Sequence, residues 1–214
     1  MKLMSRRSWS RAAVHAVALA ILLPAPAPMA AQRGAAPAEA SLIYLVRHAE
    51  RAQDDPRDPR LAPAGEARAE ELARVLAGAP LTGVFSTDLR RTRATARPVA
   101  AAHGLEVEVY DSRPAGLAAL AAELRARPGH HLVVGHSNTT PELVGLLGGD
   151  PGPPIPESEY DRLYVVLVWP AAGPVGTETP GSPPGGNAAP GGVTSTLLRY
   201  GARSGAAPAG GDAW

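Results

Sequence analysis

The sequence contains no cysteine and only one lysine, Lys2, among its 214 residues. Without cysteine the chain cannot form a disulfide, a zinc ribbon, a thiol nucleophile or a lipoprotein anchor. Basic and acidic side chains nearly balance, 21 against 20, for a formal net charge of +1. Nucleic-acid binding needs a large cationic surface, so we expect no nucleic-acid partner.

The N-terminal apolar run is too short to cross a membrane. It covers residues 12–23, whereas a spanning helix needs about 20 apolar residues. Basic residues precede the run and a Pro/Ala-rich stretch follows it, an order that predicts a secretory signal peptide over residues 1–31. The alternatives are an uncleaved anchor or a misplaced start. We therefore expect a periplasmic or secreted protein with no stable membrane anchor after signal removal.

Glycine and proline are abundant, at 23 residues each. Many of them lie in residues 170–192, which contain almost nothing that could be buried and are predicted to form a disordered loop. Because residues 193–200 again resemble a strand, we interpret the loop as the tip of a hairpin. The 45% hydrophobic content is sufficient for one domain over residues 42–200, preceded by a linker (32–41) and followed by a flexible tail (201–214).

Strand and helix patterns alternate within this domain. Apolar runs predict strands at residues 42–46, 84–86, 107–109, 132–134 and 163–168. Helical spacing predicts helices at residues 63–77, 89–103, around 117–124 and at 141–147. Pro98 is expected to kink the second helix or to end it early. Repeated strand–helix units predict an α/β fold with a mostly parallel sheet and helices on both faces.

Histidine and arginine side chains follow three of these strands. The first strand runs into Arg47 and His48, the second into residues 86–91, and the fourth into residues 135–138, which include His136. Ligands of parallel sheets collect at the carboxyl ends of the strands. A neutral imidazole can attack phosphorus, and guanidinium groups match phosphoryl oxygens. The sequence therefore predicts a phosphoryl-binding site at this edge.

Three segments, in this order, resemble the histidine phosphatase superfamily, also called phosphoglycerate mutase-like. They are Leu45–Glu50 (LVRHAE), Ser86–Arg91 (STDLRR) and Val134–Ser137 (VGHS), and residues 61–65 are similar to the family's turn into the first helix. The resemblance implies a three-layer sandwich over residues 42–200, close to the compact phosphohistidine-phosphatase-like branch. It also implies that His48 is a nucleophile that becomes phosphohistidine, without cofactor or metal. Arg47, Arg91 and His136 would hold the phosphoryl oxygens.

Two further residues near these segments, Arg51 and Asn138, have two interpretations each. Arg51 lies where some branches place a further phosphate ligand, but it could also be an exposed salt-bridging arginine. Asn138 is a candidate substrate contact, although Ser137 and Asn138 are also suited to cap the next helix. Gly135 suits a tight, exposed strand end. His130 and His131 have no spacing to His136 that is typical of a metal site.

The acidic segment that protonates the leaving group in many family members has no clear match. Asp111, just after the third strand, is the best positional candidate for this general acid; the alternative is a solvent-exposed turn aspartate. Ala49 also replaces the family's commoner glycine after the nucleophile. Compact relatives that dephosphorylate phosphohistidine are similar in lacking an obvious acid, since imidazole is already a good leaving group.

We therefore expect an exported, cofactor-independent phosphatase that acts on a phosphomonoester or phosphoramidate, either a small molecule or a phosphoprotein. The predicted connections are short and leave little room for substrate-covering insertions, which favours an open site. Two alternatives remain at this point. One is a phosphoglycerate mutase-type phosphoryl transferase, and the other is a binding module that holds a phosphorylated ligand without turnover.

Overall fold

The computed structural model describes residues 40–169 and 192–204, which belong to one unit that begins at Pro37. Within these ranges no helix is both long and apolar enough to cross a membrane. The predicted signal peptide, nearly all of the linker and of the loop over residues 170–192, and most of the tail lie outside the described residues.

The described residues form a six-stranded sheet with the order β3-β2-β4-β1-β5-β6. β1, β2, β3 and β4 are parallel, and β5 pairs antiparallel with both β1 and β6. The sheet is therefore mostly parallel, as predicted. The strands span Ser41–Arg47 (β1), Leu81–Ser86 (β2), Val107–Val109 (β3), Gly129–Gly135 (β4), Arg162–Val168 (β5) and Val193–Arg199 (β6).

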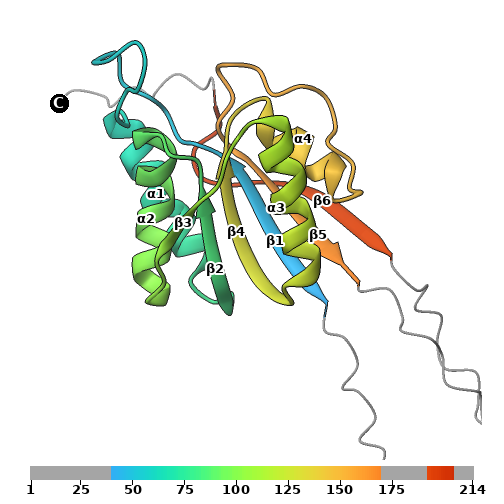
Figure 1. The fold of residues 1–214 in the computed structure, drawn as a ribbon. Helices are drawn as coiled ribbons and strands as arrows, with labels where there is room; N and C mark the ends of the chain where they lie inside the picture. Colours follow the sequence, from blue (N-terminus) through green and yellow to red (C-terminus); the bar gives the residue numbers. More distant parts are fainter. Residues whose placement is uncertain (1–39, 170–191, 205–214) are drawn as a thin grey trace, which may run out of the picture. The chain divides into compact units, whose positions relative to one another are not determined.

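Helices cover both faces of the sheet, which confirms the predicted α/β sandwich (Figure 1). α1 and α2 contact each other on one face, and α3 and α4 pack on the other. The helices span Pro63–Leu76 (α1), Arg90–His103 (α2), Pro114–Ala126 (α3) and Thr139–Leu146 (α4). The predicted hairpin is also present, because β5 and β6 pair from Arg162↔Arg199 to Val168↔Val193.

Two prolines lie inside helices of the structure, Pro98 in α2 and Pro141 in α4. Pro98 does not end α2, which continues to His103 and stops at Gly104 in a left-handed conformation, φ 65°. The residues after Pro98, Val99 and Ala100, are buried against the sheet, and this packing holds the last turn in place. α4 begins at Thr139, two residues before Pro141. Pro141 is thus in the first turn, where its missing N–H has no intrahelical partner to lose.

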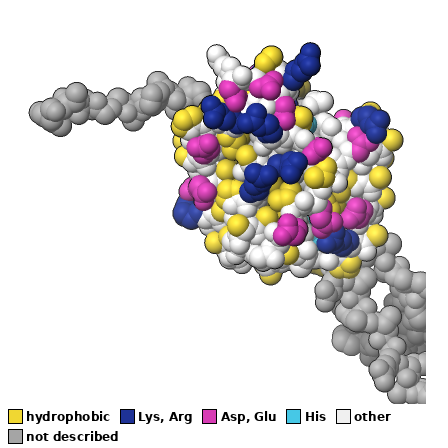
Figure 2. Space-filling view, turned by 60° about the vertical axis from the view of Figure 1, so that its left-hand side comes forward, with side chains coloured by type: hydrophobic (Ala, Val, Ile, Leu, Met, Phe, Trp, Pro, Cys, Tyr) yellow, Lys and Arg dark blue, Asp and Glu magenta, His cyan; other side chains and the backbone are white. Residues whose placement is uncertain are grey.

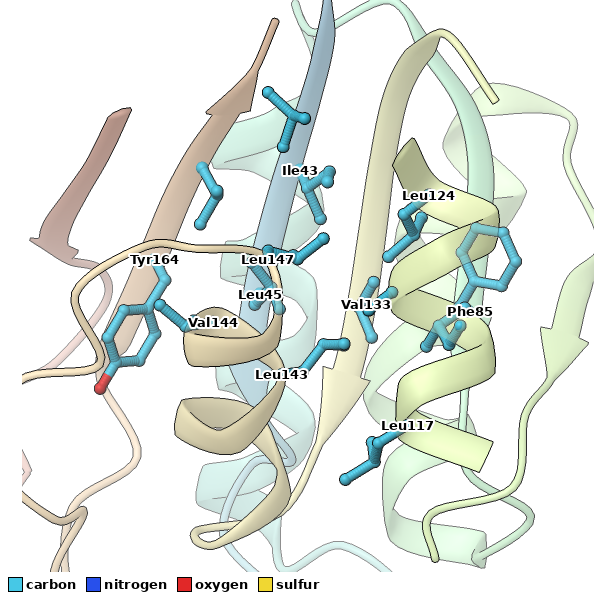
Figure 3. Close-up of a cluster of buried hydrophobic side chains, with 14 of the residues drawn as sticks. Ile43, Leu45, Phe85, Leu117, Leu124, Val133, Leu143, Val144, Leu147 and Tyr164 are labelled. Carbon is cyan, nitrogen blue, oxygen red and sulfur yellow. The ribbon is translucent and has the colours of Figure 1, made fainter. Parts of the chain in front are cut away.

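The apolar layer under α3 and α4 sets the position of the central strands. Figure 3 shows Leu117 and Leu124 of α3 and Leu143 of α4 over Ile43 of β1 and Val133 of β4. Burial of each such side chain contributes about 1.5–3 kcal/mol. The packing keeps β1 beside β4.

The register of β1 and β4 brings two histidines together. Arg47 pairs with Gly135 at the end of the two strands. The next residue on each strand, His48 or His136, therefore lies at the same edge of the sheet. The His48 backbone N–H donates to the Gly135 carbonyl at 2.9 Å. Two segments far apart in sequence therefore reach one site through strand pairing alone.

Candidate active site

A pocket of about 200 Å³ opens at the carboxyl ends of β1, β2 and β4. Its wall contains Arg47, His48, Arg51, Arg91, His136, Ser137, Asn138 and Glu157. Six of the seven candidate site residues therefore lie together, and only Asp111 is missing from the wall. Glu157 is present although the sequence analysis did not select it.

The His48 ring is held with one nitrogen free. Its Nδ1 lies 2.7 Å from the Ala49 carbonyl oxygen. A carbonyl can only accept, so Nδ1 carries the proton and Nε2 keeps its lone pair. Burial lowers the pKa of His48 to about 3, the Ala49 hydrogen bond opposes that shift, and the charges of Arg47 and Arg91 add to it. His48 is therefore a neutral, oriented imidazole at physiological pH.

A chain of hydroxyl groups orients His136, whose ring centroid is 5.5 Å from that of His48. The Thr92 hydroxyl donates to the Leu89 carbonyl at 2.8 Å, so it accepts from Thr87, 2.8 Å away. The Thr87 hydroxyl oxygen therefore accepts a hydrogen bond from the Nε2–H group of His136, at 3.0 Å. Burial and the neighbouring arginine charges lower the pKa of His136 to about 4. Both histidines are therefore neutral at physiological pH.

Arg91 presents donors that have no hydrogen-bond acceptor in the described part of the chain. It lies in the first turn of α2, and its side chain is only 15% exposed. Among the described residues, its Nε and Nη1 are buried without a hydrogen-bond partner, and the Asp58 carboxylate is 3.9 Å from Nη1. Nε of Arg47 is unpartnered in the same way. Buried donors without acceptors are costly, and a bound oxyanion would satisfy them.

Arg47 has a second role that the sequence did not reveal. Its Nη1 donates to the carbonyl oxygens of Pro156, Glu157 and Glu159 at 2.9, 3.0 and 2.9 Å. Its guanidinium carbon also lies 4.2 Å from the centre of the Tyr160 ring. Arg47 therefore fastens the segment between α4 and β5 to the pocket, and chiefly Nε remains for a ligand.

Glu157 enters the pocket through this attachment. Its carboxylate accepts from Nη2 of Arg47 at 2.8 Å and from the Ser137 hydroxyl at 2.8 Å. The Ser137 hydrogen bond lowers the pKa of Glu157, and the charges of Arg47 and Arg51 lower it further. Glu157 is therefore ionised, with a side chain 70% exposed. The sequence around it, a proline-rich stretch, carries no motif that would have identified it.

The expected helix caps differ in the structure. Ser137 binds Glu157, and Asn138 makes no side-chain capping bond at the start of α4. Thr139 instead accepts the His136 backbone N–H through its hydroxyl, at 2.9 Å. Gly135 is buried, not exposed as predicted. A Cβ at Gly135 would lie 2.9 Å from the Thr140 hydroxyl oxygen, so the tight approach of α4 requires glycine.

Asp111 is not part of the pocket. Arg113 binds its carboxylate, with Nη2 at 2.6 Å from Oδ2. These hydrogen bonds from Arg113 lower the pKa of Asp111, which is the wrong direction for a proton donor. The structure thus favours the alternative, a turn aspartate, and the general-acid interpretation is corrected. His130 and His131 begin β4, and the described residues contain no cluster of three or more His, Asp or Glu side chains suited to a metal.

Comparison with known proteins agrees with this geometry. Residues 43–112 match the model of the histidine phosphatase superfamily, branch 1. A structure of the protein histidine phosphatase SixA complexed with tungstate is 23% identical with a TM-score of 0.50, covering 58% of this chain and 86% of that chain. The mycobacterial glucosyl-3-phosphoglycerate phosphatase is 18% identical with a TM-score of 0.50, covering 61% and 91%.

A third structure, mycobacterial hydrolase 2, is 16% identical with a TM-score of 0.51, covering 79% of this chain and 94% of that chain. No curated protein sequence matches the chain. The structural likenesses establish the fold, and the matched segment contains Arg47, His48 and Arg91. Over residues 43–112 the chain is therefore similar to the histidine phosphatase superfamily, and its fold is that of the solved phosphatase structures.

Proposed function

We propose that the protein is an exported, cofactor-independent phosphatase that hydrolyses a phosphomonoester or phosphoramidate through a phosphohistidine intermediate on His48. One observation carries the proposal. The Ala49 carbonyl fixes the proton of His48 on Nδ1, so that Nε2 is a free nucleophile in a pocket with unpartnered arginine donors.

In the first step, Nε2 of His48 attacks phosphorus as the bond to the leaving oxygen or nitrogen breaks. The leaving group departs with the bonding electron pair and takes a proton from solvent. The N–H groups of Arg91 and Nε of Arg47 bind the phosphoryl oxygens, whose charge they stabilise throughout the transfer. Nδ1 keeps its proton, which stays hydrogen-bonded to the Ala49 carbonyl, so the phosphorylated ring carries one positive charge.

In the second step, water attacks phosphorus and the P–Nε2 bond breaks. The electron pair returns to Nε2, the protons of the water leave with the phosphate, and His48 regains its neutral Nδ1–H form. Because Nδ1 stays protonated through the cycle, the Ala49 contact returns the nucleophile to its starting state without a proton relay.

The acid-base groups of the pocket favour substrates with good leaving groups. The one carboxylate in the pocket wall, Glu157, has a lowered pKa and is ionised at neutral pH. An aryl oxygen or a protonated imidazole departs without strong general-acid help, whereas an alkoxide requires it. The similar SixA structure is that of a protein histidine phosphatase, which supports including phosphoramidates in the proposed substrate class.

A generic aryl phosphate tests the proposal. We expect release of inorganic phosphate by the wild type and a loss of roughly 10³-fold or more in His48→Ala. His103→Ala, at the end of α2, is the matched control, because within residues 40–169 and 192–204 the His103 ring bonds the Leu76 carbonyl alone. Tight phosphate binding without turnover would identify a binding module. Transfer between phosphoglycerates faster than phosphate release would identify a mutase.

Export is a separate part of the proposal, supported by the basic and apolar pattern of residues 1–31. Fusion of these residues to a reporter that is active only outside the cytoplasm should produce activity, and deletion of residues 12–23 should abolish it. N-terminal sequencing of the exported protein would define the cleavage site. Equal reporter activity in both fusions would contradict export.

A further inference from the structure

A second hollow adjoins the anion pocket. It has a volume of about 500 Å³ and shares Ser137 and Asn138 with the pocket as wall residues. The rest of its wall comes from α4 and from the segment before β5, mainly Pro141, Gly145, Pro151, Pro154 and Ile155. A molecule bound at Ser137 or Asn138 could therefore extend from one hollow into the other.

The two hollows differ sharply in chemistry. Three arginines and two histidines line the anion pocket, whereas prolines, glycines and one isoleucine dominate the groove. The only ionisable group among the groove's described wall residues is Glu142. A second anionic group on the substrate would lose its hydration there without gaining a cation, and it would share the groove with the Glu142 carboxylate.

The groove walls are held in place by hydrogen bonds from β5. Arg162 donates to the carbonyls of Pro153 and Pro154 at 2.6 and 3.2 Å, and the Tyr164 hydroxyl donates to the Pro151 carbonyl at 3.0 Å. Arg47 donates to the carbonyl of Pro156, which follows the groove wall in sequence, and holds it beside the anion pocket. A pre-formed groove binds an apolar group without first being ordered.

We propose that this groove binds the leaving group of the substrate, and that the substrate is a phosphate monoester of an apolar, uncharged aryl alcohol. The inference rests on the proposed phosphatase activity and deepens it. The phosphoryl group lies against the arginines, and the aryl ring lies across Ser137 and Asn138 into the groove between α4 and the proline-rich segment.

The test compares 2-naphthyl phosphate with phenyl phosphate, whose leaving groups have similar acidity and differ in apolar area. We expect kcat/KM to be about tenfold higher for the naphthyl ester. Gly145→Phe should remove this preference, because Gly145 lies in the groove wall and its Cβ position faces open space. Gly78→Phe is the matched control, since Gly78 is also exposed and a Cβ there also meets open space, but it lies beyond the end of α1.

Inhibition by inorganic phosphate should be the same in the wild type and both variants, which shows that the anion pocket is intact. A carboxylate on the far naphthyl ring should reduce the preference, and Glu142→Gln should restore part of it. Equal kcat/KM for the two esters, or an unchanged preference in Gly145→Phe, would overturn the groove assignment. Failure of His48 to be required for phenyl phosphate hydrolysis would instead overturn the proposed function.

Discussion

At the scale of single residues, burial decides the chemistry of the two histidines. His48 is 3% exposed, and desolvation is the largest cause of its lowered pKa and of that of His136. A charged imidazole could not attack phosphorus, so burial keeps the proposed nucleophile, His48, in its neutral form well below neutral pH. The same lowered pKa values reduce the free energy of unfolding under acidic conditions.

We predict that acid destabilises the fold through these histidines. In the unfolded chain their pKa is about 6.5, whereas the folded values are about 3 for His48 and about 4 for His136. Between the folded and unfolded pKa values the unfolded state binds more protons than the folded state. The contribution of these histidines to the free energy of unfolding is therefore complete above about pH 6.5 and decreases as the pH falls. The expected loss at pH 5 is roughly 2 kcal/mol per histidine. Urea unfolding at pH 7 and pH 5 measures it, and His48→Gln should show about half the loss.

We predict that Glu157→Gln tightens phosphate binding. The Glu157 carboxylate occupies Nη2 of Arg47 and places a negative charge in the pocket wall. Its removal should lower the Kd for inorganic phosphate by about tenfold, the equivalent of one charge-assisted contact. Glu106→Gln, just before β3 and hence at the opposite end of the sheet, is the control. Weaker phosphate binding in Glu157→Gln would show that Glu157 supports the ligand instead of competing with it.

At the scale of elements, local pattern predicted most strands and helices because apolar runs and helical spacing are short-range signals. The short β3 was predicted from the alternation of Val107 and Val109 with charged residues. Local pattern could not predict which other elements pack against the end of a strand. Gly135 looked exposed in sequence, but the α4 hydroxyls close over it. The length of α2 likewise depends on burial of Val99 and Ala100 after Pro98.

We predict that Gly135→Ala reduces both stability and activity. The new methyl group would meet the hydroxyl oxygens of Thr140 and Thr139 at 2.9 and 3.0 Å. Displacement of α4 costs about 1–3 kcal/mol and moves His136, so kcat/KM should fall as well. Gly145→Ala, in open space on α4, should stabilise the helix by about 0.5–1 kcal/mol. Urea unfolding and aryl phosphate kinetics distinguish the two, and equal stabilities would refute the crowding argument.

At the scale of the whole molecule, the three motifs predicted which residues meet, because strand ends of a parallel sheet share an edge. Glu157 was not predicted because its position depends on hydrogen bonds from Arg47 to backbone carbonyls 109–112 residues away. Every residue has a backbone carbonyl, so such a contact cannot be inferred from residue types. Figure 2 shows basic and acidic side chains interspersed over one side of the molecule. Surface ion pairs such as Arg93–Asp88, at 3.0 Å, also join side chains of opposite charge.

We predict that residues 170–191 are dispensable for hydrolysis. β5 and β6 pair as far as Val168↔Val193, and the Trp169 N–H donates to the Gly192 carbonyl at 2.9 Å, so the two chain ends are already adjacent. Replacement of residues 170–191 by Asn-Gly would close the hairpin with a two-residue turn. Turnover of an aryl phosphate should stay within about twofold of the wild type. Loss of turnover in a folded protein would mean that the loop contributes to the site.

The most direct measurement is the trapping of the phosphorylated enzyme. After rapid mixing with a ³²P-labelled aryl phosphate and denaturation in base, we expect label on the protein that survives base and is released by acid. Peptide mapping should assign it to His48, and His48→Ala should carry none. Label that is absent during active turnover, or that lies on another residue, would contradict the account.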